Sequence, residues 1–405
     1  MSREENSIMT TNFSFHQNIP NLNRTQQNIS GAKHILQDCC YWLGAVITLS
    51  IIFISTPSLA EPYLAYKTNN KCSACHVNPV GGGARNTYGN FYGTRVLPAK
   101  AGDDVMFDPG ALADTLRIGT DIRANFTHTN QEESATDDTT TTQGFETQNA
   151  QVYLHFQPKG SRFSFYLDEQ VAPGAALTRE AFVLARLGKS HYIKAGRMML
   201  PYGIRLEDDS AFVRQFTQFN FDNNDNGVEL GLEFQRAVVN FAVTNGTSSD
   251  RNEDDKLQYL VKTEWLGNNW RVGGNALINQ SSGGDRQMYG AYAGINVAGF
   301  TFLFEADRIR DESIQNAFGD DIEQNIFFAE VNRQIRDGLN LKLTYELADP
   351  DINIDENQRT RSSAVAEYTP VSNVQFRGGL RIGDDIPQRD IGNFNTFFVQ
   401  AHFYY

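Results

Sequence analysis

From Asp114 to the C-terminus, the chain repeats segments of about ten residues in which apolar and polar side chains alternate. Successive side chains of a β-strand point to opposite faces, so each segment predicts a strand with one apolar and one polar face. Clear examples are 116–126, 150–156, 228–234 and 339–347. The polar face would meet water in a soluble sandwich, but it would line the lumen of an outer-membrane barrel, whose apolar face meets lipid.

The connections between these segments separate the two folds, because seven short turns alternate with eight longer polar stretches. The short turns are Pro158–Ser161, Gly188–Ser190, Gln235–Ala237, Leu266–Asn269, Val297–Gly299, Arg333–Gly338 and Pro370–Ser372. The longer stretches lie near 128–145, 169–180, 199–226, 245–256, 279–287, 310–322, 348–360 and 383–394. Seven plus eight connections join sixteen strands, so both barrel termini lie on the short-turn side, which faces the periplasm in such barrels.

The last segment, FFVQAHFYY, carries the strongest barrel signal. Its apolar face comprises Phe397, Val399, Ala401, Phe403 and Tyr405. The terminal aromatic residue is similar to the end of the closing strand of bacterial outer-membrane proteins. Trp265 and Trp270 flank one short turn, where an interfacial aromatic belt would place them. We predict an all-β fold, an antiparallel outer-membrane β-barrel of about 16 strands over 114–405, with a soluble all-β sandwich as the main alternative.

The chain as a whole is acidic. Its 405 residues include 48 Asp and Glu against 35 Lys and Arg, a net charge of −13, and 12% of the residues are aromatic. This balance suits an acidic β-rich protein and excludes a nucleic-acid binder, which presents a basic surface. Carboxylates gather in the longer connections, as in EESATDD and DPDINIDEN. They could concentrate extracellular metal cations, because hard cations prefer oxygen ligands, or they could simply keep the loops solvated.

Residues 1–60 read as a targeting segment that precedes the fold. Trp42–Ile54 is the only long apolar run, and it is too short to span a bilayer as a helix. Small residues up to Ala60 then give the cleavage pattern of a secretory signal peptide, with an unusually long polar region before the apolar run. We assign 1–60 to a signal peptide, and a short membrane anchor is the alternative.

Removing 1–60 would leave two of the four cysteines, and both belong to the pentapeptide Cys72-Ser-Ala-Cys75-His76. Two thiols at this spacing can add to the two vinyl groups of one haem, and the adjacent imidazole can then bind the iron. A structural zinc site needs four ligands, and a thioredoxin-like dithiol needs a βαβ context; the flanking sequence offers neither. We predict one covalent haem c, attached at Cys72 and Cys75, with His76 as the proximal ligand.

The segment 61–100 around the pentapeptide is basic. Against Glu61 alone it carries Lys67, Lys71, Arg85, Arg95 and Lys100. These charges could neutralise haem propionates, dock an acidic redox partner or form a solvated face. Gly81–Gly83 lacks the context of a phosphate-binding loop, so we expect a loop that passes close to the porphyrin. About forty residues are too few to bury a haem alone, so the barrel, joined through the linker 101–113, must cover it.

This arrangement resembles the fused outer-membrane cytochrome-porin family, in which a monohaem c-type cytochrome segment precedes a porin-like barrel. The matching residues are Tyr66, Cys72-x-x-Cys75-His76 and Gly89-Asn-Phe91, followed by the barrel and its terminal aromatic. The resemblance implies electron transfer across the outer membrane of a Gram-negative bacterium, between extracellular Fe(II) or another metal and a periplasmic electron carrier. Val77-Asn78-Pro79 and the three glycines depart from the iron-oxidising pattern, which leaves the metal open.

In this reading the protein is an electron carrier that could also oxidise Fe(II). The alternative is a solute porin in which the haem segment is a plug or a redox-sensitive gate. The run from Gly196 to Gly203, GRMMLPYG, is similar to a run in porins and is compatible with a pore-narrowing loop over 199–226. A blocked lumen would favour the electron conduit, whereas an open, charged lumen with a free haem segment would favour the porin.

Three residues are candidates for a distal iron ligand. His402 lies on the predicted lumenal face of the last strand, three residues from its end, and His155 lies on the lumenal face of an earlier strand. Met106 lies in the linker and could fold back, an arrangement that raises the reduction potential of a haem. His128 falls in a predicted outer loop and His191 shares the face of apolar residues, so both are poor candidates. A water, backbone or five-coordinate site is the alternative.

Overall fold

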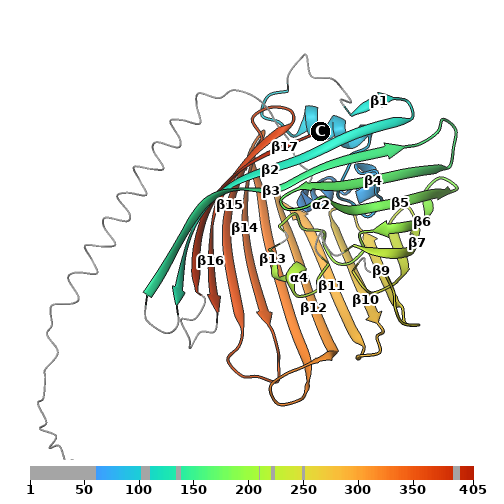
Figure 1. Ribbon diagram of the computed structural model, residues 1–405. Helices are drawn as coiled ribbons and strands as arrows, with labels where there is room; N and C mark the ends of the chain where they lie inside the picture. Colours follow the sequence, from blue (N-terminus) through green and yellow to red (C-terminus); the bar gives the residue numbers. More distant parts are fainter. Residues whose placement is uncertain are drawn as a thin grey trace, which may run out of the picture. The chain divides into compact units, whose positions relative to one another are not determined.

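The computed structural model describes residues 61–101, 110–133, 138–208, 210–219, 224–248, 251–385 and 393–405. The predicted signal peptide 1–60 and most of the predicted linker, including Met106, lie outside these residues. Within them, strands β2 to β17 form a closed antiparallel barrel (Figure 1), because each strand pairs with the next and β17 pairs with β2. The prediction of a 16-stranded antiparallel barrel is confirmed.

The strands of the barrel follow the alternating segments of the sequence. Their bounds are β2 Leu116–Glu133, β3 Asp138–Phe156, β4 Phe163–Ala172, β5 Leu177–Leu187, β6 His191–Met198, β7 Asp225–Glu233, β8 Ala237–Thr244, β9 Gln258–Leu266, β10 Trp270–Asn279, β11 Arg286–Val297, β12 Phe300–Gln315, β13 Asp321–Arg336, β14 Leu339–Asp349, β15 Arg359–Tyr368, β16 Val374–Asp385 and β17 Phe394–Tyr404. A short strand, β1 Ala111–Ala113, pairs with the start of β2. Each of the seven predicted short turns lies at a connection between consecutive strands, but four of them overlap a strand end, and most of Arg333–Gly338 belongs to β13.

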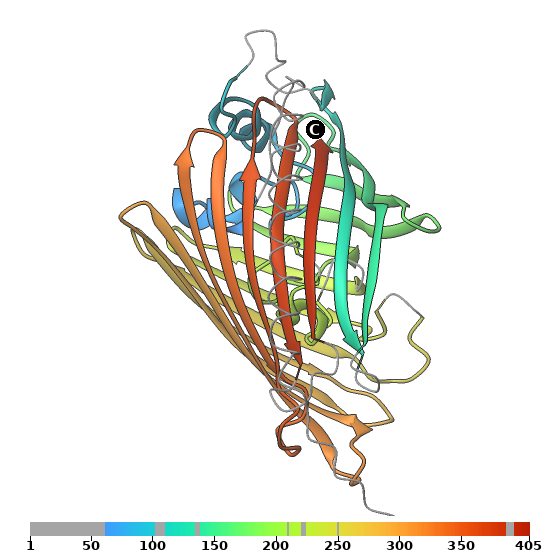
Figure 2. The same cartoon turned by 90° about the vertical axis from the view of Figure 1, so that its left-hand side faces the viewer.

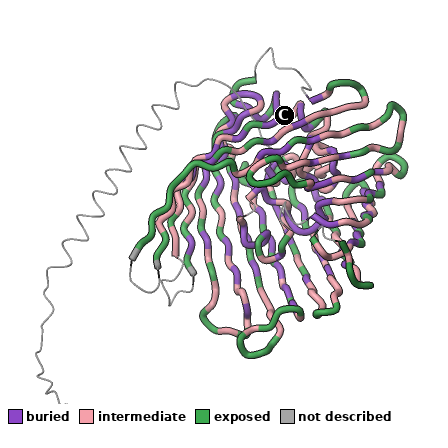
Figure 3. Tube along the Cα trace, viewed as in Figure 1, coloured by how far each residue is buried: buried purple, intermediate pink, exposed green. Residues whose placement is uncertain are grey.

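Alternation of the two faces is visible along each strand (Figure 3). On β14, Asn340, Lys342 and Glu346 are buried inside the barrel, whereas Leu341 and Leu343 are exposed on its outer face. On β17, His402 is buried and Phe403 is exposed. The outer face is therefore apolar and the inner face polar, as expected of a barrel surrounded by lipid.

Three expected loops, 128–145, 169–180 and 310–322, are wrong in their extent, because each is mostly strand. The stretch 128–145 is mostly strand, because β2 and β3 have 18 and 19 residues and continue as a hairpin that is far longer than a bilayer requires. Threonines at 139–142 favour the extended backbone through their branched Cβ atoms. His128 accordingly lies on β2, and its Nδ1 atom is 3.2 Å from Oε1 of Gln143 on β3. Acidic and polar composition alone had indicated a loop there.

The segment before the barrel forms four short helical turns. They are α2 Pro62–Thr68, the 3₁₀ turn η1 Cys72–Ala74, α3 Thr87–Phe91 and the π-type turn η2 Tyr92–Val96. Helix α2 begins with a proline, whose missing N–H costs nothing at that position, and ends at Asn69 with a left-handed φ of 55°. It buries Tyr63, Leu64 and Tyr66 and packs against β11 and β12. Among the described helices, none is long and apolar enough to cross a membrane.

This segment contacts the short turns at one end of the barrel, the end where the C-terminus lies (Figure 2). The Asn69 side chain donates to the Gly267 carbonyl in the β9–β10 turn at 2.7 Å. The backbone N–H groups of Ala99 and Lys100 donate to carbonyls of the β15–β16 turn at 2.8 and 3.0 Å. The pentapeptide is therefore carried by the barrel at its short-turn end.

A second insertion enters the barrel between β6 and β7, in the stretch 199–224, which includes the helix α4 Phe212–Gln215 (Figure 1). Its described residues bind the inner wall. The Tyr202 hydroxyl donates to Asp307 at 2.8 Å, and the Ile204 N–H donates to Glu305 on the same strand at 2.7 Å. Further along, the Phe212 N–H donates to Glu346 at 2.8 Å. The described residues of this inner loop, 199–224, occupy lumen that the barrel would otherwise leave open.

Candidate functional site

The pentapeptide is a tight turn that gathers its three side chains. The N–H groups of Cys75 and His76 both donate to the Cys72 carbonyl, at 3.1 and 3.0 Å. This bonding closes the 3₁₀ turn and lets the two cysteines and the histidine all line one cavity. Both cysteines are free thiols.

Asn86 holds this turn in place from the next helix. Its amide nitrogen donates to the carbonyls of Ser73 and Ala74 at 3.2 and 3.1 Å. Its amide oxygen accepts the N–H of Gly89 at 3.0 Å and caps the start of α3. A Cβ at Gly89 would collide with the Cys75 carbonyl, so the glycine permits the close approach of α3 to the motif. An Asn directly before a helix is a capping signal, yet it gave no hint that Asn86 would also hold the motif.

Three glycines form the opposite rim of the motif. Gly81, Gly82 and Gly83 have φ angles of +91°, +77° and +60°, which side chains with a Cβ rarely adopt. A Cβ at Gly81 would lie 3.3 Å from the Cβ of Cys72, and one at Gly83 would collide with the Tyr166 hydroxyl. The glycines thus let the backbone pass between the motif and the barrel wall, and all three line the same cavity.

The cavity beside the motif has a volume of about 340 Å³. Such a volume falls in the range of small-molecule and cofactor pockets. Aromatic side chains contribute much of its lining. They are Tyr66, Tyr92, Tyr153 and Tyr292. The barrel wall, the N-terminal segment and the inner loop all contribute residues, so the cavity exists only in the assembled fold.

The chemistry of the motif fits a covalently attached haem. His76 has its Nδ1 atom buried without a hydrogen-bond partner among the described residues. Burial, with the positive charges of Arg85 and Arg205, lowers the pKa of His76 to about 3, so its imidazole is neutral and able to bind a metal. Burial raises the pKa of the Cys75 thiol to about 11. In the described part of the chain, no three His, Cys, Asp or Glu side chains converge on a metal-binding point, as a zinc site would require.

Asn78, two residues after His76, ties the segment to the inner wall. It is fully buried, and its amide nitrogen lies 2.9 Å from Glu180 on β5. Its amide oxygen accepts from Lys194 on β6 at 3.4 Å, and Lys194 forms a 2.7 Å ion pair with Glu229 on β7. A buried charge pair with these extra hydrogen bonds has its polar groups satisfied. The wall is built to receive this residue.

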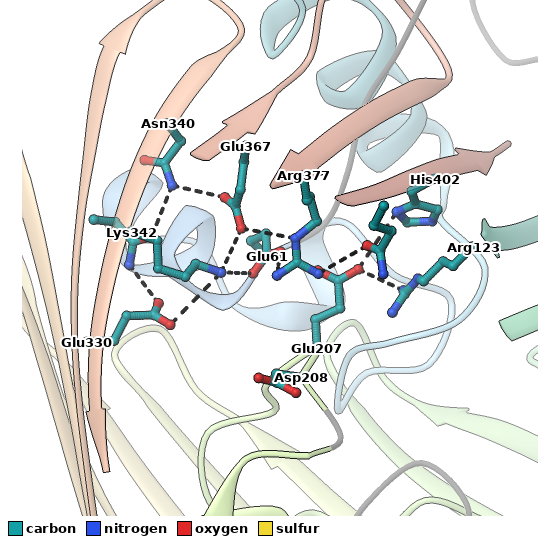
Figure 4. A network of polar contacts seen from close by, with 12 residues as sticks. Glu61, Arg123, Glu207, Asp208, Glu330, Asn340, Lys342, Glu367, Arg377 and His402 are labelled. Atoms are coloured by element: carbon teal, nitrogen blue, oxygen red, sulfur yellow. Dashed lines mark hydrogen bonds and ion pairs between the residues drawn. The ribbon is translucent and has the colours of Figure 1, made fainter. Parts of the chain in front are cut away.

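The start of the segment enters a second buried network (Figure 4). The Glu61 carboxylate lies 2.8 Å from the Lys342 ammonium and 3.7 Å from the Arg377 guanidinium. Lys342 also lies 2.8 Å from Glu367 and 3.9 Å from Glu330. Burial, together with the nearby charge of Glu207, raises the pKa of Glu61.

Glu207, on the inner loop, extends this network to Arg123 on β2 (Figure 4). It lies 2.8 Å from Arg123 and 3.6 Å from Arg377. Burial alone would raise the pKa of Glu207, but the charges of the two guanidinium groups lower it below its usual value. Beyond Arg123, Asp121 lies 2.8 Å from Nε2 of His402. The network therefore joins the N-terminal segment, the inner loop and six barrel strands, β13 to β17 and β2.

The two predicted distal ligands in the described part of the chain do not line the cavity. His402 is fully buried on β17 and faces Asp121, and it does not contribute to the cavity lining. His155 lies on β3 opposite Tyr166 and is likewise absent from that lining. Met106 lies outside the described residues. The identity of a distal ligand stays a prediction.

Solved porin structures share the fold of this chain. An anion-selective porin from Comamonas acidovorans matches with a TM-score of 0.56 and 12% sequence identity, covering 72% of this chain and 99% of that chain. A loop-deletion mutant of OmpT, an outer membrane protein of Vibrio cholerae, matches with a TM-score of 0.54, 12% identity and coverages of 72% and 99%. The outer membrane channel DcaP of Acinetobacter baumannii matches with a TM-score of 0.52, 11% identity and coverages of 72% and 97%.

No protein-family model matches the sequence, and no curated protein gives a significant match. At the identities of the solved structures, the likeness concerns the fold. The chain folds as a porin-like, closed, antiparallel β-barrel.

Proposed function

We propose that this protein is an outer-membrane electron carrier with one haem c attached at Cys72 and Cys75 and bound through His76. The observation that carries the proposal is the cavity inside the barrel, which the two thiols, the neutral imidazole and three backbone-only glycines line together. A haem bound there would supply a one-electron couple, whose potential depends on its ligands and surroundings. The porin-like fold and the apolar outer face of the barrel support a location in the outer membrane, in contact with lipid.

The residues around the motif have roles that follow from their contacts. Asn86 fixes the turn, so that the two thiols and the imidazole keep one mutual arrangement. Burial keeps His76 neutral over the physiological pH range. The barrel wall, the N-terminal segment and the inner loop all contribute residues to the cavity lining. A protein scaffold that holds ligands rigidly in this way reduces the rearrangement that accompanies a change of charge.

Orientation supports an electron path between two sides of the membrane. Short turns face the periplasm in barrels of this class, so the motif would lie near the periplasmic mouth, within reach of a periplasmic electron carrier. The longer, acidic connections would face outward, where they could attract a cationic metal such as iron. We propose extracellular iron or another metal as the second redox partner.

The first test is the mass of the mature protein. We expect one haem of added mass that resists acid-acetone extraction, and its loss in the double variant Cys72→Ala, Cys75→Ala, whose barrel should still fold. Ser73→Ala is the matched control, since it lies between the two cysteines and leaves both thiols in place. A bare polypeptide from cells with working haem attachment would contradict the proposal.

A solute porin, with the N-terminal segment as plug or redox gate, is the second candidate. The observation that favours it is the likeness of the barrel to solved porins. Liposome swelling separates the two functions. A conduit should give no swelling in small sugars beyond that of empty liposomes, whereas a porin should give rapid swelling, which a gate would make dependent on the redox state.

A further inference from the structure

Two cations line the cavity without a carboxylate partner. Arg205, on the inner loop, donates to the carbonyls of Gly81 and Leu200 at 3.0 and 3.1 Å and to the sulfur of Met199 at 3.2 Å. Lys262, on β9, donates to the Gly203 carbonyl at 2.6 Å and lies 4.8 Å from the centre of the Tyr292 ring. Within the described ranges neither side chain forms an ion pair, and all of their hydrogen-bond acceptors are neutral.

Three other cations around the cavity have a carboxylate partner, whereas Arg85, which also lines it, lies 3.9 Å from the centre of the Tyr404 ring. Arg271 lies 3.2 Å from Glu264, Arg123 lies 3.0 Å from Asp121, and Lys71 lies 3.9 Å from Glu233. A charge removed from bulk water without a counter-charge is costly, so buried cations are normally paired. Arg205 and Lys262 are half-buried at the same place without a counter-charge, and burial lowers the pKa of Arg205. The missing counter-charges point to an anionic ligand in the cavity.

The two cations lie beside the cysteine motif. Arg205 contacts the Gly81 carbonyl, and Gly81 packs against Cys72. Both cations are close enough to Cys72 to interact electrostatically with its thiol. Lys262 and Arg205 also hold the same short piece of the inner loop, through the carbonyls of Gly203 and Leu200. An anionic group attached near Cys72 would therefore meet both positive charges.

We infer that Arg205 and Lys262 bind the carboxylates of the ligand in this cavity, which are the two propionates of the covalently attached haem. The inference rests on the proposed function. Thioether formation consumes the vinyl groups of the porphyrin and leaves its two propionates ionised. Two carboxylates can meet both of these cations with opposite charge, and charge-assisted hydrogen bonds of this kind are the strong ones. A free anion such as phosphate shares this chemistry and is the other source to be tested.

The test measures the midpoint potential of the purified full-length haem protein in detergent. In Arg205→Gln or Lys262→Gln, a carboxylate loses its counter-charge, and the uncompensated negative charge stabilises the ferric form. We expect each change to shift the ferric to ferrous ratio at fixed ambient potential about tenfold toward ferric, which is about 59 mV for one electron. Arg205→Lys and Lys262→Arg retain the charge and should restore most of the potential. Lys159→Gln, at an exposed turn, is the control and should leave the potential unchanged.

A second measurement needs no variant. Redox-difference infrared spectra of the unaltered protein, carrying haem labelled with ¹³C at the propionate carboxyls, should show labelled bands of ionised carboxylates that are shifted by hydrogen bonding. Added phosphate should leave these spectra unchanged. Potentials that stay the same in both Gln variants, or spectra of the unaltered protein that change when phosphate is added, would overturn the assignment while leaving haem attachment intact. A wild-type protein without covalent haem would instead overturn the proposed function.

Discussion

The lumen holds two groups of cations with opposite surroundings, one buried and one half-buried. In the network around Lys342 and Arg377, each cation has two or more carboxylates within ion-pair distance, supplied by the wall, the N-terminal segment and the inner loop. In the cavity beside Cys72, Arg205 and Lys262 bond only to neutral acceptors. Both groups belong to the same barrel, so we attribute the difference in their ion pairing to a difference in function.

The first group of cations attaches the inserted segments to the barrel wall, whereas the second is placed to bind a ligand. Glu61 and Glu207 bring carboxylates from two inserted segments to cations of the wall, and these ion pairs hold both segments inside the barrel. In the cavity, Arg205 and Lys262 have no ion-pair partner among the described residues, at the place where the cysteine motif would attach a ligand. Substitutions in the first region should therefore alter the stability and permeability of the barrel, whereas substitutions in the second should alter the properties of the bound ligand.

The largest expected effect follows from removing the central cation of the network. Lys342→Met leaves Glu61, Glu330 and Glu367 buried without it, and breaking a buried pair in this way costs about 3–5 kcal/mol. The midpoint of unfolding in urea, measured by the heat-modifiable mobility of the detergent-folded protein, should fall accordingly. Lys159→Met, which removes an exposed ion pair with Asp114, is the control and should leave the midpoint unchanged. Equal midpoints for the two variants would contradict the fastening role.

The two carboxylates that meet in the network should respond unequally to neutralisation. Glu61 has a raised pKa, which favours its protonated form, whereas Glu207 has a lowered pKa, which favours its ionised form. Glu207→Gln should therefore cost about 3 kcal/mol and Glu61→Gln about 1 kcal/mol on the same unfolding measurement. A larger loss of stability for Glu61→Gln than for Glu207→Gln would contradict the assignment of the ionised form to Glu207 and the protonated form to Glu61.

Acidification should loosen the inner loop. The Arg381 and Arg361 guanidinium groups overcome the burial penalty and lower the pKa of Asp208, and Arg123 and Arg377 do the same for Glu207. A lowered pKa contributes stability above the ordinary carboxyl pKa, near about 4, and this contribution is lost as the pH falls toward the lowered value. Planar-bilayer conductance should stay constant from neutral pH to about 5 and rise below about 4.

The double variant Glu207→Gln, Asp208→Asn tests whether protonation of these two carboxylates causes the rise in conductance. It should conduct at neutral pH and show no further rise on acidification. Conductance that rises with acid to the same extent in this variant would assign the pH dependence to other groups.

The smallest expected effect concerns the support of the motif. Asn86→Ala removes the cap of α3 and the donors to the Ser73 and Ala74 carbonyls, and loss of a cap costs about 1 kcal/mol. Limited proteolysis of the detergent-folded protein should show faster cleavage within 72–91, with an unchanged unfolding midpoint for the barrel. Asn86→Asp retains the capping oxygen and should lie between the alanine variant and the wild type.

The sequence was a good guide to the barrel and a poor one to its interior. Alternation fixes which side chains face lipid, so the sixteen strands and their short turns were predictable from the chain alone. The hairpin over 128–145 was not, because acidic and polar residues are compatible with both a loop and a strand that extends beyond the membrane. Spacing could single out Cys72, Cys75 and His76, since they are neighbours in the chain.

The contacts that the inner wall makes with the N-terminal segment and the inner loop join residues far apart in the sequence. No local sequence pattern predicts them. Lys342 meets Glu61 across 281 positions of sequence, and Asn78 meets Glu180 across 102. Lys262 and Arg205 come together because the inner loop folds back into the lumen, which alternation within a strand does not specify. The charge of each residue was visible, but its pairing depended on the closed fold.

Electron transfer across a membrane tests the central claim most directly. Proteoliposomes should enclose an oxidised, membrane-impermeant dye and receive Fe(II) outside, with dye retention followed in the same sample. The account predicts reduction of the enclosed dye without its release, and loss of that reduction in the double variant Cys72→Ala, Cys75→Ala. Equal dye reduction by the variant, or leakage of the dye through the wild-type barrel, would contradict it.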